Sequence, residues 1–104
     1  MVGRDVLFFV YLLASKPYGT LYTGYTDDLY KRIREHRAKV RPGFTAKYGV
    51  TRLVWFEAHG TRHEAWVRER RIKEWNRDWK IRLIEETNPH WLDLYPGLEF
   101  EHRL

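Results

Sequence analysis

Apolar and polar positions first divide the chain into segments that look like strands. Residues 6–13 form an unbroken run of β-branched, aromatic and aliphatic side chains, and Pro17 and Gly19 mark a turn after it. Residues 20–24 then read as a second strand, so the two segments predict an antiparallel hairpin. Because the first run does not alternate, we expect its strand to be buried on both faces. A third strand is predicted at residues 52–58.

Helical spacing takes over between the second and third strands. Residues 26–28 offer side chains for a helix N-cap, and Leu29 and Ile33 then recur at helical spacing through about residue 39. Residues 41–43, with their Pro and Gly, break this helix. We therefore expect residues 44–49 to form a polar, basic loop that leads into the third strand.

A capping signature introduces the second long helix. Thr61 and Glu64 form a capping box, in which each side chain satisfies a backbone donor at a helix start. The spacing predicts a helix over residues 62–75 and another over residues 77–86, which Asn88 and Pro89 close. The tail, residues 90–104, has apolar residues but no clear period.

The order of these elements predicts the fold class. Two strands, a helix, a strand and two helices indicate an α+β domain, with a small three-stranded antiparallel sheet flanked by helices. The length of 104 residues leaves room for one domain and one active site. We therefore expect a single domain over residues 1–104, with the motif-bearing part at about 6–86 and a C-terminal tail at 87–104.

Composition and charge narrow the classes of partner. The chain has 19 Lys and Arg against 14 Asp and Glu, and a net charge of +5 attracts a polyanion such as nucleic acid. It has no Cys, which excludes disulfides, thiolate zinc sites and a Cys nucleophile. The longest apolar run, residues 6–14, is shorter than the roughly 20 residues of a membrane-spanning helix. With no signal-peptide pattern either, we expect a cytoplasmic protein, monomeric and without a membrane partner.

Glu69 is the most informative candidate for chemistry. Ala65, Ile72 and Asn76 share its helix face, so Glu69 lies in or beside the stripe that should face the sheet. A carboxylate in that place needs a partner. The structural alternative is an ion pair with one of the neighbouring arginines, which are Arg68, Arg70 and Arg71. Glu64, by contrast, is explained by its capping role.

Four other side chains are candidates only in combination. Arg32 and His36 lie one helical turn apart beside the apolar stripe, so both can reach one pocket, as a phosphate clamp and a proton acceptor. Tyr11 and Tyr22 lie on the two paired strands, where aromatic residues are common in any case. Neither pair identifies a site by itself.

Three spaced motifs together resemble a known family. Tyr11, with Phe9 and Val10 before it, and the triplet at residues 22–24 resemble the paired Gly-Ile-Tyr and Tyr-Ile-Gly signature of the GIY-YIG nuclease superfamily. Arg32 and His36 resemble its catalytic Arg and the His found in many members. Glu69, between Ala65 and the pair Ile72-Lys73, resembles its metal-binding Glu. The similarity runs from about residue 8 to residue 83 and is strongest to the small, single-domain bacterial members.

The chain departs from the family pattern at a few positions. Phe9 and Val10 stand in place of Gly-Ile, and Thr23 stands in place of the Ile of the second triplet, while both tyrosines are kept. The late Asn of the family has two candidate counterparts, Asn76 and Asn88, and the sequence does not choose between them.

The resemblance implies a metal-dependent endonuclease acting on nucleic acid, DNA in the first place, in repair or recombination. It implies one Mg²⁺ or Mn²⁺ held by Glu69, and an Arg32 that neutralises charge on the scissile phosphate. Tyr11, Tyr22 or His36 would position or deprotonate the attacking water. A histidine has the ordinary pKa closest to neutrality, whereas a tyrosine would need help from the metal or from Arg32.

Residues around this site are expected to bind nucleic acid. The predicted contacts are Lys31, Arg37, Lys39, Arg41, Lys47 and Tyr48. Aromatic residues that lie between these basic residues are expected to stack on exposed bases, namely Tyr18, Tyr30, Phe44 and Tyr48. A solvated basic face explains the same charges equally well.

Two other functions are compatible with the same residues. One is a non-catalytic nucleic-acid binding module with the same fold, although the kept Tyr, Arg and Glu residues argue against it. The other is a basic interaction protein that docks through an aromatic patch of Trp66, Trp75, Trp79 and Trp91, although core and helix packing explains these residues better.

Overall fold

The computed structural model describes residues 7–40 and 42–103, and for residues 102 and 103 the backbone alone. Arg41, a predicted nucleic-acid contact, lies outside the described residues. Three strands form one antiparallel sheet, as the sequence predicts, and their order in the sheet is β2-β1-β3. The strands are β1 (Phe8–Ala14), β2 (Leu21–Thr26) and β3 (Arg52–His59).

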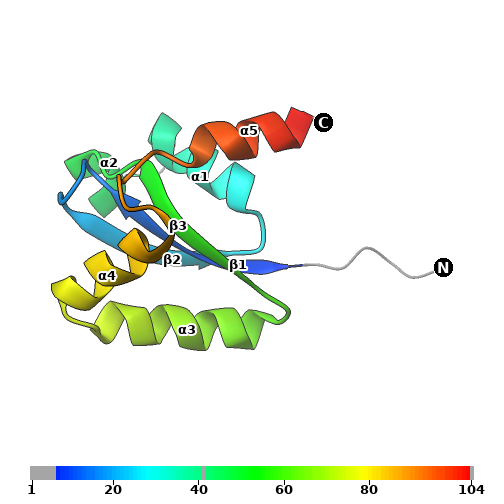
Figure 1. The fold of residues 1–104 in the computed structure, drawn as a ribbon. Helices are drawn as coiled ribbons and strands as arrows, with labels where there is room; N and C mark the ends of the chain where they lie inside the picture. Colours follow the sequence, from blue (N-terminus) through cyan, green and yellow to red (C-terminus); the bar gives the residue numbers. More distant parts are fainter. Residues whose placement is uncertain (1–6, 41, 104) are drawn as a thin grey trace.

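Helices cover both faces of the sheet (Figure 1). One layer holds α1 (Leu29–Ala38), α2 (Phe44–Tyr48) and α5 (Tyr95–Arg103). The opposite layer holds α3 (Arg62–Glu74) and α4 (Arg77–Thr87). The predicted α+β class is confirmed, and among the described residues no helix combines the length and the apolar character that crossing a membrane requires.

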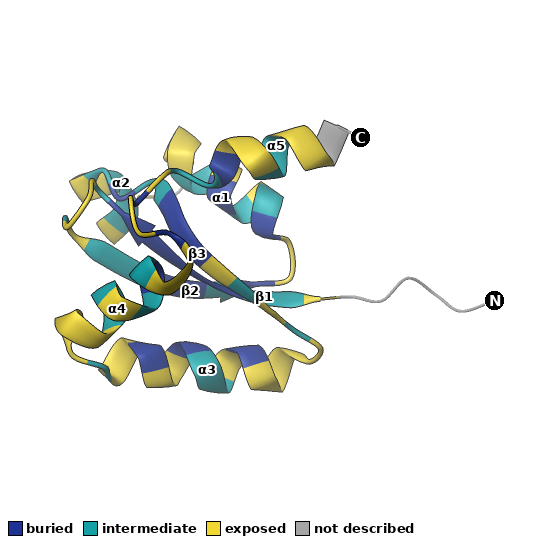
Figure 2. Ribbon diagram, viewed as in Figure 1, coloured by how far each residue is buried: buried dark blue, intermediate teal, exposed yellow. Residues whose placement is uncertain are grey.

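The central strand β1 divides the core in two. Val10, Leu12 and Ala14 pack against α3 and α4, while Tyr11 and Leu13 pack against the α1 layer. All five side chains are fully buried, and Figure 2 shows buried residues concentrated on the strands between the helices. The expected burial of this strand on both faces is confirmed, and it places Tyr11 inside the layer that carries α1.

Two segments differ from the sequence-based prediction. Residues 44–49 were expected to be a loop, but α2 forms there between Gly43 and Gly49, two glycines with positive φ. The tail was expected to lack regular structure, but α5 begins at Tyr95, whose backbone N–H donates to the Asp93 carboxylate. Both helices are short or weakly patterned, so tertiary contacts select them.

The boundaries of α3 are close to the prediction, with two corrections. Thr61 caps the helix as predicted, by accepting from the backbone N–H of Glu64. The Glu64 carboxylate accepts from the Thr61 hydroxyl rather than from the backbone donor that a capping box predicts. The helix ends at Glu74, and the next residue is extended. The prediction that Asn76 shares the helix face of Glu69 is therefore wrong. Asn76 is the N-cap of α4, and its side chain accepts from the backbone N–H of Trp79.

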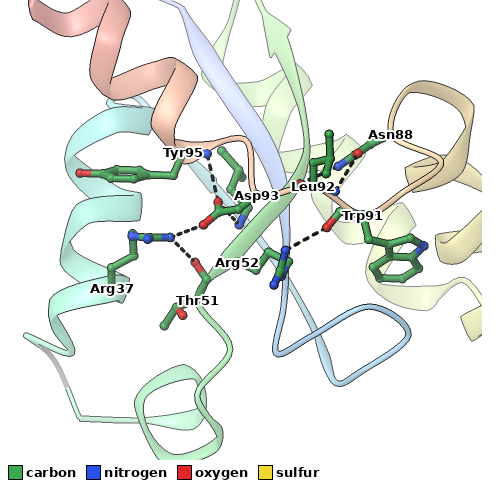
Figure 3. A network of polar contacts seen from close by, with 9 residues as sticks. Arg37, Thr51, Arg52, Asn88, Trp91, Leu92, Asp93 and Tyr95 are labelled. Carbon is green, nitrogen blue, oxygen red and sulfur yellow. Dashed lines mark hydrogen bonds and ion pairs between the residues drawn. The ribbon is translucent and has the colours of Figure 1, made fainter.

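A polar network fastens the tail to the rest of the domain (Figure 3). One Asp93 oxygen accepts from the backbone N–H groups of Leu53 and Tyr95, at 3.2 and 3.0 Å. The other oxygen lies 2.6 Å from the Arg37 guanidinium on α1. The Asn88 side chain bonds twice to the backbone of Leu92 and once to the carbonyl of Val54. The tail thus links α1 to β3.

Replacing Asp93 with alanine should lower the free energy of unfolding by about 2 to 3 kcal/mol, because two backbone donors and one guanidinium lose their acceptor. Urea denaturation followed by circular dichroism measures the loss. Asp93→Asn keeps an oxygen for the two backbone donors and should cost less. Equal stability of the wild type and Asp93→Ala would show that the tail is not held through this carboxylate.

Candidate active site

Side chains of β2, α1 and α2 line one concave pocket. Tyr22 comes from β2, Arg32 and His36 come from α1, and Thr45 belongs to α2. The N-cap of α1 sets the direction of that helix, since the Asp28 carboxylate accepts from the backbone N–H of Lys31. Three predicted site residues thus meet in one pocket. The remaining lining residues are Glu35, Lys39, Pro42, Gly43 and Phe44.

Tyr11, fully buried on the central strand, does not line the pocket itself but contacts His36, which does. Its hydroxyl lies 3.0 Å from Nε2 of His36, and the other ring nitrogen of His36 lies 3.0 Å from the Thr45 hydroxyl. Burial raises the pKa of Tyr11 far above its ordinary value; the charges of Tyr22 and Glu69 add to the increase, and that of Arg32 opposes it.

The raised pKa keeps Tyr11 neutral. A neutral phenol can donate or accept, so its bond to Nε2 of His36 can run in either direction. When Tyr11 donates, Nε2 is the acceptor nitrogen, and Nδ1 carries the hydrogen that the Thr45 hydroxyl accepts. In either tautomer, Tyr11 and Thr45 hold the imidazole in one orientation.

Gly24 makes room for Tyr11. The two residues pair across β1 and β2, and a Cβ on Gly24 would lie 2.5 Å from the Tyr11 hydroxyl oxygen and 2.6 Å from the ring carbon that bears it. No side chain fits at that distance. The glycine of the Tyr-x-Gly triplet is therefore required by the close approach of the catalytic candidate Tyr11.

Gly24→Ala should displace the Tyr11 ring and lower the free energy of unfolding by about 2 kcal/mol, the usual cost of overpacking. A melt followed by circular dichroism measures the loss, and the NMR signals of the His36 ring should shift as its bond to Tyr11 breaks. Gly60→Ala is the matched control, because a Cβ there meets nothing within 4 Å. Unchanged His36 signals in folded Gly24→Ala would refute the close packing.

Arg32 has an acidic neighbour on its own helix. Its Nε lies 3.4 Å from the carboxylate of Glu35, three residues later. Glu35 lines the same pocket and was not singled out from the sequence. The pair orients the guanidinium from its Nε side, and a hydrogen bond from Arg32 to Tyr11 opposes the rise in the pKa of that hydroxyl.

Glu69 approaches from the other layer. It is only 8% exposed, and Ala65 and Ile72 on the same face are fully buried, as the helical spacing predicts. Its ion-pair partner is Lys73, 3.3 Å away, rather than one of the three expected arginines. It is not among the pocket-lining residues, but its charge acts on Tyr11. Since β2 is an edge strand, groups from both layers can approach each other beyond it.

The donor set around Glu69 suits a particular class of metal. Among the side chains of residues 7–40 and 42–101, no three His, Asp or Glu gather into a ready-made cage. One carboxylate fits Mg²⁺ or Mn²⁺, hard cations that keep water and take substrate oxygens as further ligands. Lys73 is 51% exposed on its side chain, so it is free to move aside when a cation replaces it.

The predicted nucleic-acid contacts separate into two groups. Lys39 lines the pocket, and Lys31, Lys47 and Tyr48 are exposed. Arg37 is instead engaged by Asp93 and lies over the Tyr95 ring at 4.5 Å. Its charge is therefore compensated within the protein.

Two of the four aromatic candidates and both candidate asparagines have partners within the protein. Tyr30 stacks on Tyr95, and Tyr18 packs on Trp91 and bonds to Glu85. Asn76 and Asn88 both bond to backbone groups, and neither lines the pocket.

The four candidate patch tryptophans do not form one surface. Trp91 is buried and Trp75 is half-buried, whereas Trp66 and Trp79 are exposed. Core packing thus accounts for Trp91, and helix packing in part for Trp75.

Comparisons of the sequence and of the structure find relatives of this chain. Residues 7–82 match the sequence model of the GIY-YIG catalytic domain. A UPF0213 protein of Haloquadratum walsbyi is 43% identical over 67 residues, which are 64% of this chain and 75% of that protein. One of Clostridium perfringens is 40% identical over 80 residues, covering 77% and 85%. The solution NMR structure of a UPF0213 protein of Bacillus halodurans has a TM-score of 0.53 at 30% identity, covering 84% of this chain and 92% of that one.

Proposed function

Because this chain belongs to the GIY-YIG family, we propose that it is a metal-dependent endonuclease that hydrolyses nucleic-acid phosphodiester bonds, DNA in the first place, in repair or recombination. The observation that carries the proposal is the contact of Tyr11 with His36 at the pocket that Arg32 lines. Two groups able to move a proton and one permanent cation suit the hydrolysis of an anionic ester.

The Tyr11 and His36 pair supplies a path for the proton of the attacking water. The Tyr11 oxygen takes a proton from water while its own proton passes to Nε2 of His36, 3.0 Å away. Thr45 keeps the imidazole aligned by accepting from Nδ1. The water oxygen bonds to phosphorus, one P–O ester bond breaks, and the leaving oxygen takes up a proton from solvent, to which His36 returns the proton that it accepted. Tyr11 thus passes on one proton as it gains another, so the hydroxyl never has to ionise before the reaction begins.

Arg32 and Glu69 complete the arrangement. The guanidinium of Arg32 donates to the phosphate oxygens, where negative charge grows during the reaction. Glu69 would hold the Mg²⁺ or Mn²⁺, which when bound supplies charge neutralisation at the phosphate and makes a coordinated water more acidic. Tyr22, on the pocket wall, positions the water.

A substrate panel tests the proposed activity. Labelled DNA and RNA, as single strands, duplexes, flaps and branches, are incubated with Mg²⁺ or Mn²⁺ and with EDTA, next to a Glu69→Gln control. We expect cleavage of at least one DNA substrate by the wild type alone, and only with metal. Binding without cleavage across the whole panel would favour the non-catalytic module.

A further inference from the structure

An exposed line of aromatic rings leads out of the pocket. Tyr22 lines the pocket, and its ring centre lies 6.5 Å from that of Phe44 at an interplanar angle of 27°. Phe44 in turn lies 5.0 Å from Tyr48, on the next turn of α2. Phe44 is 47% exposed and Tyr48 52% exposed. We call these three residues the aromatic strip.

The charge around the aromatic strip favours an anionic partner. Lys39 lines the pocket beside Phe44, and the ammonium of Lys47 lies 5.3 Å from the Tyr48 ring centre. The sequence contains no Asp or Glu between Glu35 and Glu57. A partner that is both negatively charged and rich in flat apolar faces is a nucleic acid with accessible bases.

Four other aromatic residues that the sequence singles out lack this combination. Tyr30 is stacked on Tyr95, and Tyr18 packs against Trp91, so their rings already have partners. Trp66 and Trp79 are exposed, but they lie on α3 and α4, in the layer on the other face of the sheet from α2. The aromatic strip is continuous with the pocket that holds Arg32.

We propose that the aromatic strip stacks on unpaired bases next to the phosphate bound in the pocket. The preferred substrate is therefore a single strand, or a duplex with a single-stranded segment at the scissile phosphate. Bases inside a duplex have both faces covered by their neighbours, so they offer nothing to Phe44 or Tyr48, whereas unpaired bases do. This inference rests on the proposed function, because it takes the pocket to be the phosphate site.

Binding in a cleavage-deficient background tests the inference apart from the activity. Fluorescein-labelled single-stranded DNA, single-stranded RNA and blunt duplex DNA of equal length are titrated with Glu69→Gln protein, alone and combined with Phe44→Ala or Tyr48→Ala. We expect each alanine to weaken single-strand binding about tenfold and duplex binding less than about twofold. The two single-strand arms show whether deoxyribose or ribose is preferred.

Matched variants separate stacking from charge and from folding. Phe44→Trp should retain single-strand affinity, because it keeps a π face. Lys47→Ala should weaken single-strand and duplex binding alike, since it removes a charge that both feel. Trp66→Ala, an equally exposed aromatic outside the strip, should leave both unchanged. Melting curves confirm that each variant is folded.

Two results would overturn the inference: single-strand affinity that survives both alanine substitutions, or a loss of the same size on blunt duplex. Failure of the proposed activity would look different. The panel would then show no cleavage, while the selective loss of single-strand binding in Phe44→Ala would still stand.

Discussion

Glu69→Ala should abolish metal-dependent cleavage while nucleic-acid binding survives or tightens. The carboxylate is the proposed metal ligand, and its removal also takes a negative charge away from the phosphate site. The fold should tolerate the change, because the partner of Glu69 is the half-exposed Lys73, four residues along the same helix. After the substitution Lys73 can be solvated, so no buried charge is left without a partner. This variant should therefore lose its cleavage activity while it keeps its thermal stability.

Thermal melts and single-turnover cleavage on the same protein preparation measure that separation. Glu74→Gln is the control, since it removes an exposed carboxylate from the same helix and should leave the cleavage rate unchanged. Normal cleavage by folded Glu69→Ala would sink the assignment. It would mean that Glu69 serves only as an ion-pair partner.

Arg32→Ala should cut the cleavage rate by about two to three orders of magnitude, as for the loss of one transition-state donor, and weaken binding only modestly. Arg32→Lys should recover only part of the loss, because an ammonium lacks the forked donors of a guanidinium. Single-turnover rates at saturating protein isolate the chemical step from binding. Arg34→Ala removes the same charge from an exposed position of α1 and should change the rate little. Equal rates for Arg32→Ala and Arg34→Ala would refute a direct role for Arg32.

The sequence predicted the elements whose signals are local. The apolar run of β1, the turn at residues 17–19 and the caps at Asp28 and Thr61 each depend on neighbours along the chain, and all are confirmed. The shared pocket of Arg32 and His36 followed from their spacing on one helix. The ion pair of Glu69 with Lys73 also had a local signal, a four-residue spacing, which the prediction overlooked in favour of nearer arginines.

The remaining features depend on contacts between distant segments. The helix α2, between Gly43 and Gly49, is too short to show a helical period in the sequence. Its Thr45 belongs to the site because it contacts His36. Pro and Gly occupy the first turn of α5, so the sequence does not indicate a helix there. The helix begins where the Asp93 carboxylate accepts from the backbone N–H of Tyr95. The ion pair of Arg37 with Asp93 could not be predicted, because Asp93 lies far along the chain.

Single-turnover cleavage by Tyr11→Phe tests the central claim most directly, that the Tyr11 and His36 pair moves the proton in hydrolysis. This substitution keeps the buried ring and the net charge and removes only the hydroxyl that bonds to His36. The rate should be measured at saturating protein and metal, on the substrate that the panel identifies. We expect it to fall about 100-fold with binding unchanged, as for the loss of a general base. A rate within about twofold of wild type would contradict the account.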